Sequence, residues 1–322
     1  MRYFTNSEMQ TFKDCRRKWW LGHYRRLRPK FGKKTGAAPL GTRVHQALAG
    51  WYVPDGQTPL DPRIRLEQVL AADRAVVASK LTLPSDQLGW MEEALTPELE
   101  LKEFDKEADL ARAMIEGYVQ WISETGADAD YRVLASEVPI EYEFAPGLSI
   151  AGKMDTIVER IHDGVRLDMD HKTGDFADLR RRLRQDEQRL LYEILKRAVF
   201  PAFRSDGAVV NMIRKVKRTA AAKPPFYDRA DHMFTPTELE SAWWKVMGVI
   251  RDIQEVERRL ESGEQHHVVV YPRPNRDCHW KCEFFAVCSM LDDGSRAEDM
   301  LQSLYEEGDP MERYRQDVTN DV

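Results

Sequence analysis

The sequence lacks any long apolar run, and this absence excludes a membrane-spanning helix. No apolar stretch approaches the roughly 18–20 residues that such a helix needs. The first residues also lack the apolar segment of a secretory signal peptide. Internal repeats and low-complexity tracts are absent too, so neither a repeat array nor a biased linker is predicted. We therefore expect a soluble protein of the cytosol.

Cysteine is scarce as well. The chain has four cysteines: Cys15, Cys278, Cys282 and Cys288. An even number would suit disulfides in a secreted protein. Because no signal peptide is evident, metal binding is the better interpretation.

Basic residues are concentrated near the N-terminus, although the chain as a whole is acidic. The net charge is -6, yet residues 1–45 contain twelve Lys and Arg against two acids. Residues 291–322 have the opposite bias, with ten acids against three Arg. The basic N-terminal segment suits a phosphate backbone, and the alternative is an ordinary solvated charged face.

The apolar periodicity predicts an α/β fold with a mixed central sheet flanked by helices. With 322 residues, the chain can form one large domain with insertions. A capping box from Ser7 to Gln10 is expected to open the first helix. Helices are expected at 6–28, 41–52, 64–80, 86–125, 185–200, 235–263 and 296–307. Strands are expected at 133–144, 148–160, 165–172, 207–216 and 267–271.

These elements divide the chain into four parts. Residues 1–52 form a basic helical segment that carries Cys15, and residues 53–128 form a helical insertion in which nothing suggests chemistry. Residues 129–235 hold the strands and the helix of the α/β core. Residues 236–322 contain a long helix, three cysteines and an acidic tail.

Two acids and a lysine stand on consecutive predicted strands. Asp155 and Asp170 lie on either side of a tight turn at 162–164, which predicts a hairpin that lets their carboxylates converge. Lys172 follows Asp170 by two residues, so both side chains share one face of the strand. Such a group can hold Mg²⁺ or Mn²⁺ and activate a water. Taken alone, Asp-x-Lys is also a common surface pair.

Three further side chains complete the candidate site. Gln188 and Tyr192 are four residues apart and therefore share one helical face. His45 lies on the helix expected at 41–52, and a neutral imidazole can complete the ligand shell of a metal. Each has a structural alternative when taken singly. For Gln188 and Tyr192 it is a partly exposed helix face, and for His45 it is a purely structural histidine.

Together these residues resemble a known nuclease pattern. The order His45, Asp155, Asp170-x-Lys172, Gln188-x-x-x-Tyr192 resembles the RecB-type branch of the PD-(D/E)xK nuclease superfamily, over residues 5–290 apart from the insertion. The resemblance implies a restriction-endonuclease-like core. In that core the histidine and both acids bind the metal, the lysine is catalytic, and the Gln/Tyr helix helps to place the lysine and the DNA.

Two positions near the motifs complete the comparison with this branch. Glu137 falls where the branch often has a glutamate before the metal site. His171 stands where a tyrosine is common. In the family the middle residue of this motif is expected to lend only a backbone carbonyl to the metal, so the change need not matter.

The cysteines extend the resemblance. Cys15 with Cys278-x-x-x-Cys282-x-x-x-x-x-Cys288 resembles the iron–sulfur staple of a subset of these nucleases, including AddB-type recombination subunits and small CRISPR adaptation nucleases. This implies a structural [4Fe–4S] cluster that clamps the N-terminal helix to the C-terminal segment. The commoner family spacing is Cys-x-x-Cys-x-x-x-x-x-Cys, and the extra residue here leaves zinc and free buried thiols as alternatives.

Several aromatic side chains flank the cysteines. We expect them mainly to pack around the cluster. The alternative is that they stack on the bases of single-stranded DNA. The aromatic residues concerned are Trp19, Trp20, Trp280, Phe284 and Phe285.

We therefore expect a Mg²⁺- or Mn²⁺-dependent deoxyribonuclease. The resemblance implies an exonuclease that acts on ends or single strands in recombination, repair, or CRISPR-type or phage DNA processing. Two alternatives stay open: a DNA-binding or assembly subunit with little turnover, and a regulator in which the iron–sulfur group is the working part.

The expected surroundings follow from the same reasoning. The protein would act in the bacterial cytoplasm, or in that of the host if a phage encodes it. Recombination or CRISPR-adaptation proteins are conceivable partners, and the sequence predicts no particular oligomeric state. The basic residues expected to hold DNA phosphates are Arg16, Arg17, Arg25, Arg26, Arg181, Arg214 and Lys217.

Overall fold

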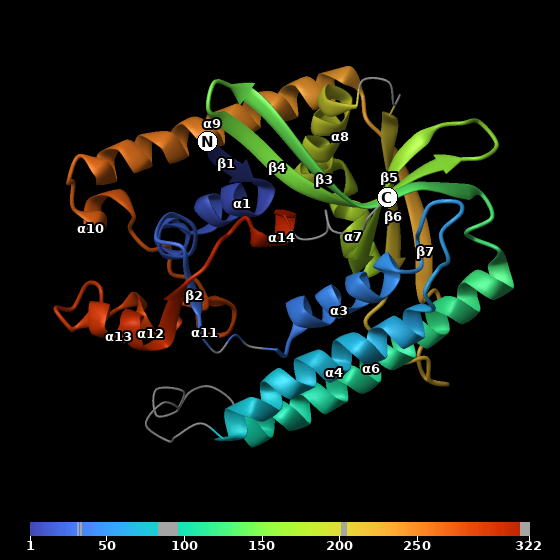
Figure 1. Ribbon diagram of the computed structural model, residues 1–322, viewed down its shortest axis with the longest axis horizontal. Coiled ribbons are helices and arrows are strands. Elements are labelled where there is room, and N and C mark those ends of the chain that lie inside the picture. Colours follow the sequence, from blue (N-terminus) through green and yellow to red (C-terminus); the bar gives the residue numbers. More distant parts are fainter. Residues whose placement is uncertain (31, 33, 83–95, 201–204, 316–322) are drawn as a thin grey trace. The chain divides into compact units, whose positions relative to one another are not determined.

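A computed structural model describes residues 1–30, 32, 34–82, 96–200 and 205–315 of the chain (Figure 1). No helix among these residues is both long enough and apolar enough to cross a membrane. The chain divides into two compact units, and each is treated by itself below. Unit 1 comprises Met1–Gly32, Glu141–Gly152 and Pro236–Val322, and unit 2 comprises Lys33–Ile140 and Lys153–Thr235.

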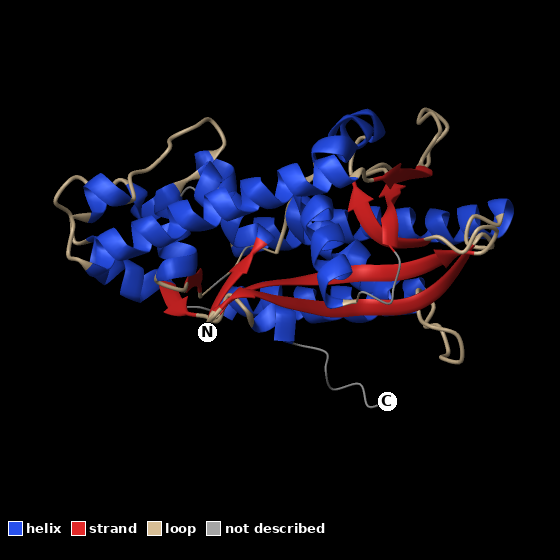
Figure 2. Cartoon of the chain, turned by 90° about the horizontal axis from the view of Figure 1, so that it is seen from above, coloured by secondary structure: helices blue, strands red, loops and turns tan. Residues whose placement is uncertain are grey.

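A mixed sheet of six strands runs through the described part of the chain. Its order is β1-β4-β5-β6-β7, and β3 also pairs with β4. The pairs β1–β4 and β5–β6 are parallel, whereas β4–β5 and β6–β7 are antiparallel. The two longest strands, β3 and β4, form the ribbon of long red arrows in Figure 2. The strands are β1 (Arg2–Thr5), β3 (Tyr131–Ala145), β4 (Leu148–Arg160), β5 (Arg166–Thr173), β6 (Ser205–Ile213) and β7 (Tyr227–Met233).

Helices cover both faces of the sheet in unit 2. On one face Val44, Phe104 and Met169 belong to a single buried apolar cluster built by helices and strands together. On the other face Leu183 packs with Val210. Strands that are buried on both faces are typical of parallel pairing with helical crossovers, here from β5 through α8 to β6. The helices are α3 (Ala37–Ala49), α4 (Pro62–Ser79), α6 (Pro97–Thr125), α7 (Phe176–Arg182) and α8 (Glu187–Val199), with short 3-10 turns at Lys80–Thr82 and Leu183–Gln185.

A buried arginine ties α3 to the two long helices beside it. Arg43 is fully buried, and its guanidinium lies 2.9 Å from a carboxylate oxygen of Asp73 on α4 and 3.4 Å from one of Glu107 on α6. Figure 1 shows α4 and α6 side by side, with α3 next to them. The helices of the expected insertion therefore support the helix that carries His45.

Unit 1 is mainly helical. Its strand β1 pairs with the start of β4, with Phe4 opposite Ile150. Trp243 of α9 makes edge-on ring contacts with Tyr142 and Phe144 of β3. Strands β2 and β8 form a separate antiparallel pair. The elements are α1 (Asn6–Asp14), α2 (Arg16–Trp19), a π-helical turn (Trp20–Tyr24), β2 (Leu27–Pro29), α9 (Pro236–Glu261), α10 (His266–Val269), α11 (Cys278–Lys281), α12 (Phe285–Cys288), α13 (Ala297–Leu304), β8 (Tyr305–Glu307) and α14 (Glu312–Arg315).

The predicted fold class is confirmed, but the N-terminal helix differs from the prediction. The single helix expected over 6–28 is wrong, because Cys15 has an extended backbone (φ -160°) that separates α1 from α2. The predicted capping box is wrong as well. Thr5 caps α1, since its hydroxyl accepts a hydrogen bond from the Glu8 backbone N–H at 3.1 Å.

Other predicted elements also need correction. The strand expected at 267–271 is wrong, since α10 occupies most of that segment. Strands β1, β2, β7 and β8 were not predicted, because they are short or too polar to alternate clearly. The predicted helix 86–125 is confirmed from Pro97, and its first part lies outside the described residues.

Close contact between β6 and β7 gives a test of the fold. A Cβ on Gly207 would lie 2.2 Å from the backbone carbonyl oxygen of His232. We predict that Gly207→Ala lowers the free energy of unfolding by about 1–3 kcal/mol, because the strands would have to separate.

The matched control is Gly248→Ala in α9, where a Cβ would meet no atom within 4 Å. It should raise the free energy of unfolding by up to about 1 kcal/mol, since alanine has a higher helix propensity than glycine. Urea unfolding measures both changes. Equal stability of Gly207→Ala and wild type would contradict the close approach of the strands.

Candidate active site

The hairpin of β4 and β5 brings the two candidate acids together. Side chains alternate along a strand, so Asp170 and Lys172 share the face of β5 opposite to His171. The backbone N–H of His171 donates to Asp155 Oδ2 on β4 at 3.0 Å. The structure therefore places both acids and the lysine at the same end of the hairpin.

His45 reaches this site from α3. Its Nδ1 atom lies 3.1 Å from Asp155 Oδ2. Burial alone would lower the pKa of His45, but the Asp155 carboxylate outweighs burial and raises it. Burial would raise the pKa of Asp155, yet His45 above all, with help from Lys172, holds that pKa well below its usual range. The contact therefore keeps Asp155 ionised and favours the protonated form of His45. A bound metal would require the ionised carboxylate but a neutral imidazole, so His45 would give up its proton on binding.

Asp170 and Lys172 form a second pair. Lys172 Nζ lies 3.0 Å from Asp170 Oδ1 and donates to Gln188 Oε1 at 3.4 Å. Burial raises the pKa of Asp170; Lys172 opposes that rise and the charge of Asp155 adds to it. Burial lowers the pKa of Lys172, but Asp170 and its neighbours outweigh burial, and the net pKa is raised. Lys172 is therefore held as a cation.

The first turn of α8 places Gln188 beside the lysine. Asp186 caps the helix, because its Oδ1 accepts from the backbone N–H groups of Gln188 and Arg189 at 3.1 and 3.3 Å. Tyr192, one turn later, is buried, and its hydroxyl lies 3.5 Å from the backbone nitrogen of Lys153 on β4. Gln188 thus contacts the lysine, and Tyr192 contacts the strand that carries Asp155.

Glu137 also lies close to the acids. Its carboxylate is 2.5 Å from Lys153 Nζ, and both Asp155 and His45 affect its pKa, which burial raises. Glu137 has φ 53°, in the left-handed region that non-glycine residues seldom adopt. Unusual backbone conformations of this kind concentrate at functional sites.

Sequence reasoning missed two cations that neutralise this group. Lys153 pairs with Glu137, and Arg189 is buried with Nε and Nη2 each 3.3 Å from Asp170 Oδ2. No periodicity marks either residue. The one available signal was chemical, since a buried carboxylate requires a counter-charge nearby.

A polar network behind β5 fixes His171. Asn211 Nδ2 donates to the Tyr118 hydroxyl at 2.7 Å and lies 2.9 Å from His171 Nδ1. An amide nitrogen only donates, so we assign the imidazole proton to Nε2. Burial lowers the pKa of His171 to about 3, and the ring is therefore neutral at pH 7. His171 is therefore held by Asn211, which in turn contacts Tyr118.

The donor chemistry of the site fits a hard divalent cation. Asp155 and Asp170 offer carboxylate oxygens and His45 offers a nitrogen, which are ligand types that Mg²⁺ and Mn²⁺ accept. Within the described ranges, no three His, Cys, Asp or Glu side chains form a ready-made metal site. The carboxylates contact basic side chains of the protein instead. Asp155 pairs with His45, and Asp170 pairs with both Lys172 and Arg189.

The cysteines lie in unit 1 and none forms a disulfide. Cys15 stands at the break between α1 and α2, Cys278 begins α11, Cys282 follows that helix, and Cys288 ends α12. Burial raises the pKa of Cys282 and of Cys288, and the charge of Cys15 adds to both rises. Within the described residues, the four cysteines do not gather into a group that could hold a metal ion.

The basic residues predicted to bind phosphates differ in exposure. Arg26, Arg181 and Lys217 are exposed, and three others are half-buried: Arg16, Arg25 and Arg214. Arg17 is 1% exposed, and its guanidinium donates to Asp292 at 2.5 Å and to the Cys288 carbonyl at 3.0 Å. A buried and paired guanidinium is not presented to a phosphate, so the structure gives Arg17 a place inside unit 1 instead.

The aromatic residues near the cysteines fall into two groups. Trp19, Trp20 and Phe284 are buried, as the packing interpretation requires. Trp280 and Phe285 are 54% and 42% exposed. These two have the exposure that base stacking needs, and stacking by them stays a prediction.

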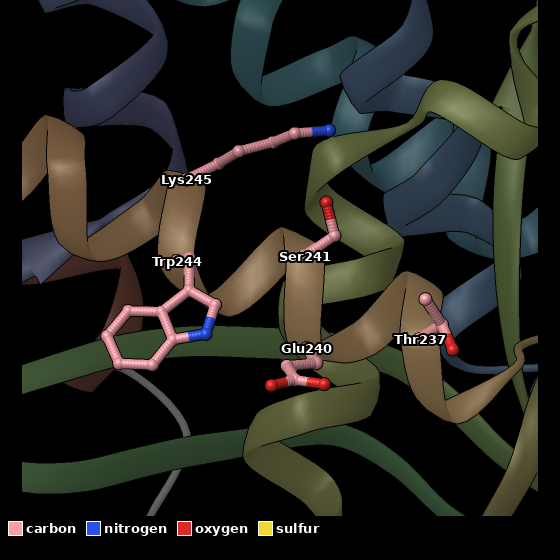
Figure 3. A pocket seen from close by; sticks show the side chains of 5 residues that line it. All are labelled: Thr237, Glu240, Ser241, Trp244 and Lys245. Atoms are coloured by element: carbon pink, nitrogen blue, oxygen red, sulfur yellow. The ribbon is translucent and has the colours of Figure 1, made fainter.

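An open hollow lies on α9 of unit 1. It is lined by Thr237, Glu240, Ser241, Trp244 and Lys245, all from that helix (Figure 3). None of the residues singled out above lines it, so no part in the chemistry is assigned to it.

Asp168 provides a pH-dependent test of this part of the structure. It is 3% exposed, and burial raises its pKa from 3.8 to about 7. Between these two values the unfolded chain loses the proton while the folded chain keeps it, so stability falls as the pH rises. We predict that Asp168→Asn removes this loss. The free energy of unfolding of the variant minus that of wild type should therefore rise by about 2.5 kcal/mol between pH 5 and pH 8.

Urea unfolding of both proteins in EDTA measures this difference. A stability difference that stays constant from pH 5 to pH 8 would show that Asp168 titrates as an ordinary carboxyl group.

Comparisons with known proteins identify the family. Among solved structures, the chain is similar to a Eubacterium rectale protein named "Putative exonuclease", with 14% identity and a TM-score of 0.33 over 78% of this chain and 100% of that one. It is also similar to the protein SSO0001, with 13% identity and a TM-score of 0.28 over 69% of this chain and 95% of that one. Scores this low support no conclusion about function.

No curated protein matches the sequence significantly. The family model of the PD-(D/E)XK nuclease superfamily matches residues 3–289, a span that includes every candidate metal-binding and catalytic residue described above. The chain therefore belongs to the PD-(D/E)XK nuclease superfamily.

Proposed function

We propose that this nuclease is a Mg²⁺- or Mn²⁺-dependent DNA exonuclease of the RecB-type branch. The observation that carries the proposal is the convergence of His45, Asp155, Asp170 and Lys172 at one end of the β4–β5 hairpin. Nucleases of this superfamily generally use divalent metal ions and act on DNA. The exonuclease mode rests on the sequence resemblance to RecB-type nucleases.

Asp155, Asp170 and His45 are the proposed metal ligands. Their donor atoms are hard oxygens and an imidazole nitrogen, and the low pKa of Asp155 keeps one carboxylate ionised at any physiological pH. When bound, a divalent cation lowers the pKa of water and offsets charge on a phosphodiester. The protein's part is to hold the ligands in place and to supply the remaining charge.

Lys172 supplies that charge. Its raised pKa keeps the ammonium group protonated, so it suits the role of a cation that orients water and stabilises negative charge on the phosphoryl oxygens. A protonated lysine is a poor general base. Gln188, whose Oε1 accepts from Lys172, would hold the ammonium group in place.

The exposed and half-buried basic residues are the proposed contacts to the DNA backbone. Arg16, Arg25 and Arg26 belong to unit 1, and Arg181, Arg214 and Lys217 belong to unit 2. Phosphate contacts of this kind give affinity without sequence preference, as a nuclease acting on arbitrary DNA requires.

The four cysteines are proposed to hold a [4Fe–4S] cluster. The proposal rests on the spacing of Cys278, Cys282 and Cys288 with Cys15 in the sequence. Such a cluster would be structural, joining α1 and α2 to the C-terminal segment. Zinc and free thiols are the alternatives.

The proposed setting is DNA recombination, repair, or CRISPR-type or phage DNA processing in a bacterial cytoplasm. It rests on the same resemblance to RecB-type, AddB-type and CRISPR adaptation nucleases. Proteins of those processes are the proposed partners.

Removal of the lysine tests the catalytic assignment. We predict that Lys172→Ala lowers DNA cleavage at least about 100-fold, because the cation that stabilises developing charge is lost, while DNA binding persists. End-labelled single- and double-stranded DNA, linear and circular, should be assayed with Mg²⁺, Mn²⁺ or EDTA. Loss of linear DNA with circles spared identifies an exonuclease, and EDTA should stop the reaction.

Lys106→Ala is the matched control, since Lys106 lies on α6 and its side chain is 76% exposed. Unchanged cleavage by Lys172→Ala would remove this lysine from the mechanism. Absence of cleavage by wild type with every metal, while DNA still binds, would favour a DNA-binding or assembly subunit.

Metal analysis tests the cysteine assignment. We predict that anaerobically purified protein is brown and contains about four iron and four sulfide ions per chain. Cys282→Ser should lose them, because a thiolate ligand is removed, and Ser289→Ala should keep them. About one zinc per colourless chain would establish the zinc alternative. Four thiols that react freely in protein without bound metal would establish the free-thiol alternative.

A further inference from the structure

Arg189 of α8 is buried beside the candidate metal site and contacts two acids. Its Nε and Nη2 atoms each lie 3.3 Å from Asp170 Oδ2, and Nη2 also lies 3.3 Å from Asp186 Oδ2. The side chain is only 3% exposed. The guanidinium therefore bridges a carboxylate of β5 and the residue that caps α8.

The two oxygens of Asp170 have different partners. Oδ2 contacts Arg189, whereas Oδ1 lies 3.0 Å from Lys172 Nζ. Lys172 in turn donates to Gln188, the residue next to Arg189. Two adjacent residues in one helical turn therefore contact the two candidate site residues of β5. Gln188 contacts the lysine, and Arg189 contacts the aspartate.

Asp186 couples the start of the helix to this contact. One of its oxygens accepts from the backbone N–H groups of Gln188 and Arg189, and the other pairs with the Arg189 guanidinium. The same carboxylate thus fixes both the first turn of α8 and the direction of the arginine side chain.

Burial of Arg189 is not explained by stability. Removing a guanidinium from water is costly, and an apolar side chain of similar volume often stabilises a protein as well or better. Nη1 is buried and has no hydrogen-bond partner within the described part of the chain. Residues that break local rules in this way are expected at functional sites.

We propose that Arg189 is a positioning residue that holds Asp170 Oδ2, so that Oδ1 is the oxygen presented to a divalent cation. The inference rests on the proposed function, in which Asp170 is a metal ligand. It requires no contact of Arg189 with the metal or with DNA. Partners that orient a ligand in this way are worth about 10- to 100-fold in metal affinity or activity.

The test is the affinity of the full chain for Mn²⁺, measured without DNA and at constant pH from the electron paramagnetic resonance signal of free Mn²⁺. Arg189→Met should weaken binding about 10- to 100-fold, because Asp170 loses the group that orients it. Arg189→Lys keeps the charge but lacks the planar fork that bridges both acids, so it should recover only part of the loss.

Arg197→Met is the matched control, because Arg197 lies on the same helix, is 39% exposed and pairs with Glu193. It should bind Mn²⁺ as wild type does. Affinity of Arg189→Met equal to or above that of wild type overturns the proposal. If that variant does not fold, Arg189→Lys decides. If Arg189→Lys then binds Mn²⁺ as tightly as wild type, the proposal is overturned. If it binds Mn²⁺ more weakly at unchanged thermal stability, the proposal is supported.

Asp170→Asn separates this inference from the proposed function. Wild-type Mn²⁺ affinity in that variant would remove Asp170 from the ligand set, and the proposed metal site would fail. Loss of binding in Asp170→Asn together with full binding in Arg189→Met would leave the metal site intact and remove only the role of Arg189.

Discussion

Crowding of carboxylates is the constraint on which the rest of this site depends. Several acids converge within unit 2, and like charges at such distances cannot all ionise unless cations stand among them. The fold provides those cations from different elements, so the site exists only when α3, β4, β5 and α8 are assembled together. The pairs are His45 with Asp155, Lys153 with Glu137, and both Lys172 and Arg189 with Asp170.

Local features of the sequence were sufficient to predict the centre of the site. A tight turn and a period of two place Asp155, Asp170 and Lys172 at one end of a hairpin, and the helical period puts Gln188 and Tyr192 on one helix face. That this face lies beside the lysine was implied only by the resemblance to RecB-type nucleases. Arg189 and Asn211 could not be predicted in this way. Their partners are set by packing between elements, which no pattern within one segment records.

The N-terminal segment shows two further limits of local patterns. Its apolar period continues through Cys15, yet one residue with an extended backbone is enough to divide the helix. Arg17 belongs to a run of basic residues, and residues of that kind are expected on the surface. It is buried because its guanidinium pairs with Asp292, far away in the sequence, and only the folded chain brings the two together.

Arg43 has a consequence for how this family member can vary in evolution. It lies on α3 two residues before His45 and is enclosed by Asp73 of α4 and Glu107 of α6. A relative that kept both helices but lost these two carboxylates would leave a buried arginine unpaired, which is strongly destabilising. A shorter relative without α4 and α6 would instead expose the apolar residues of α3 that pack against them, such as Val44 and Leu48. Residues 43, 73 and 107 should covary as a set, and the segment between them is not a module that can be gained or lost independently of the histidine helix.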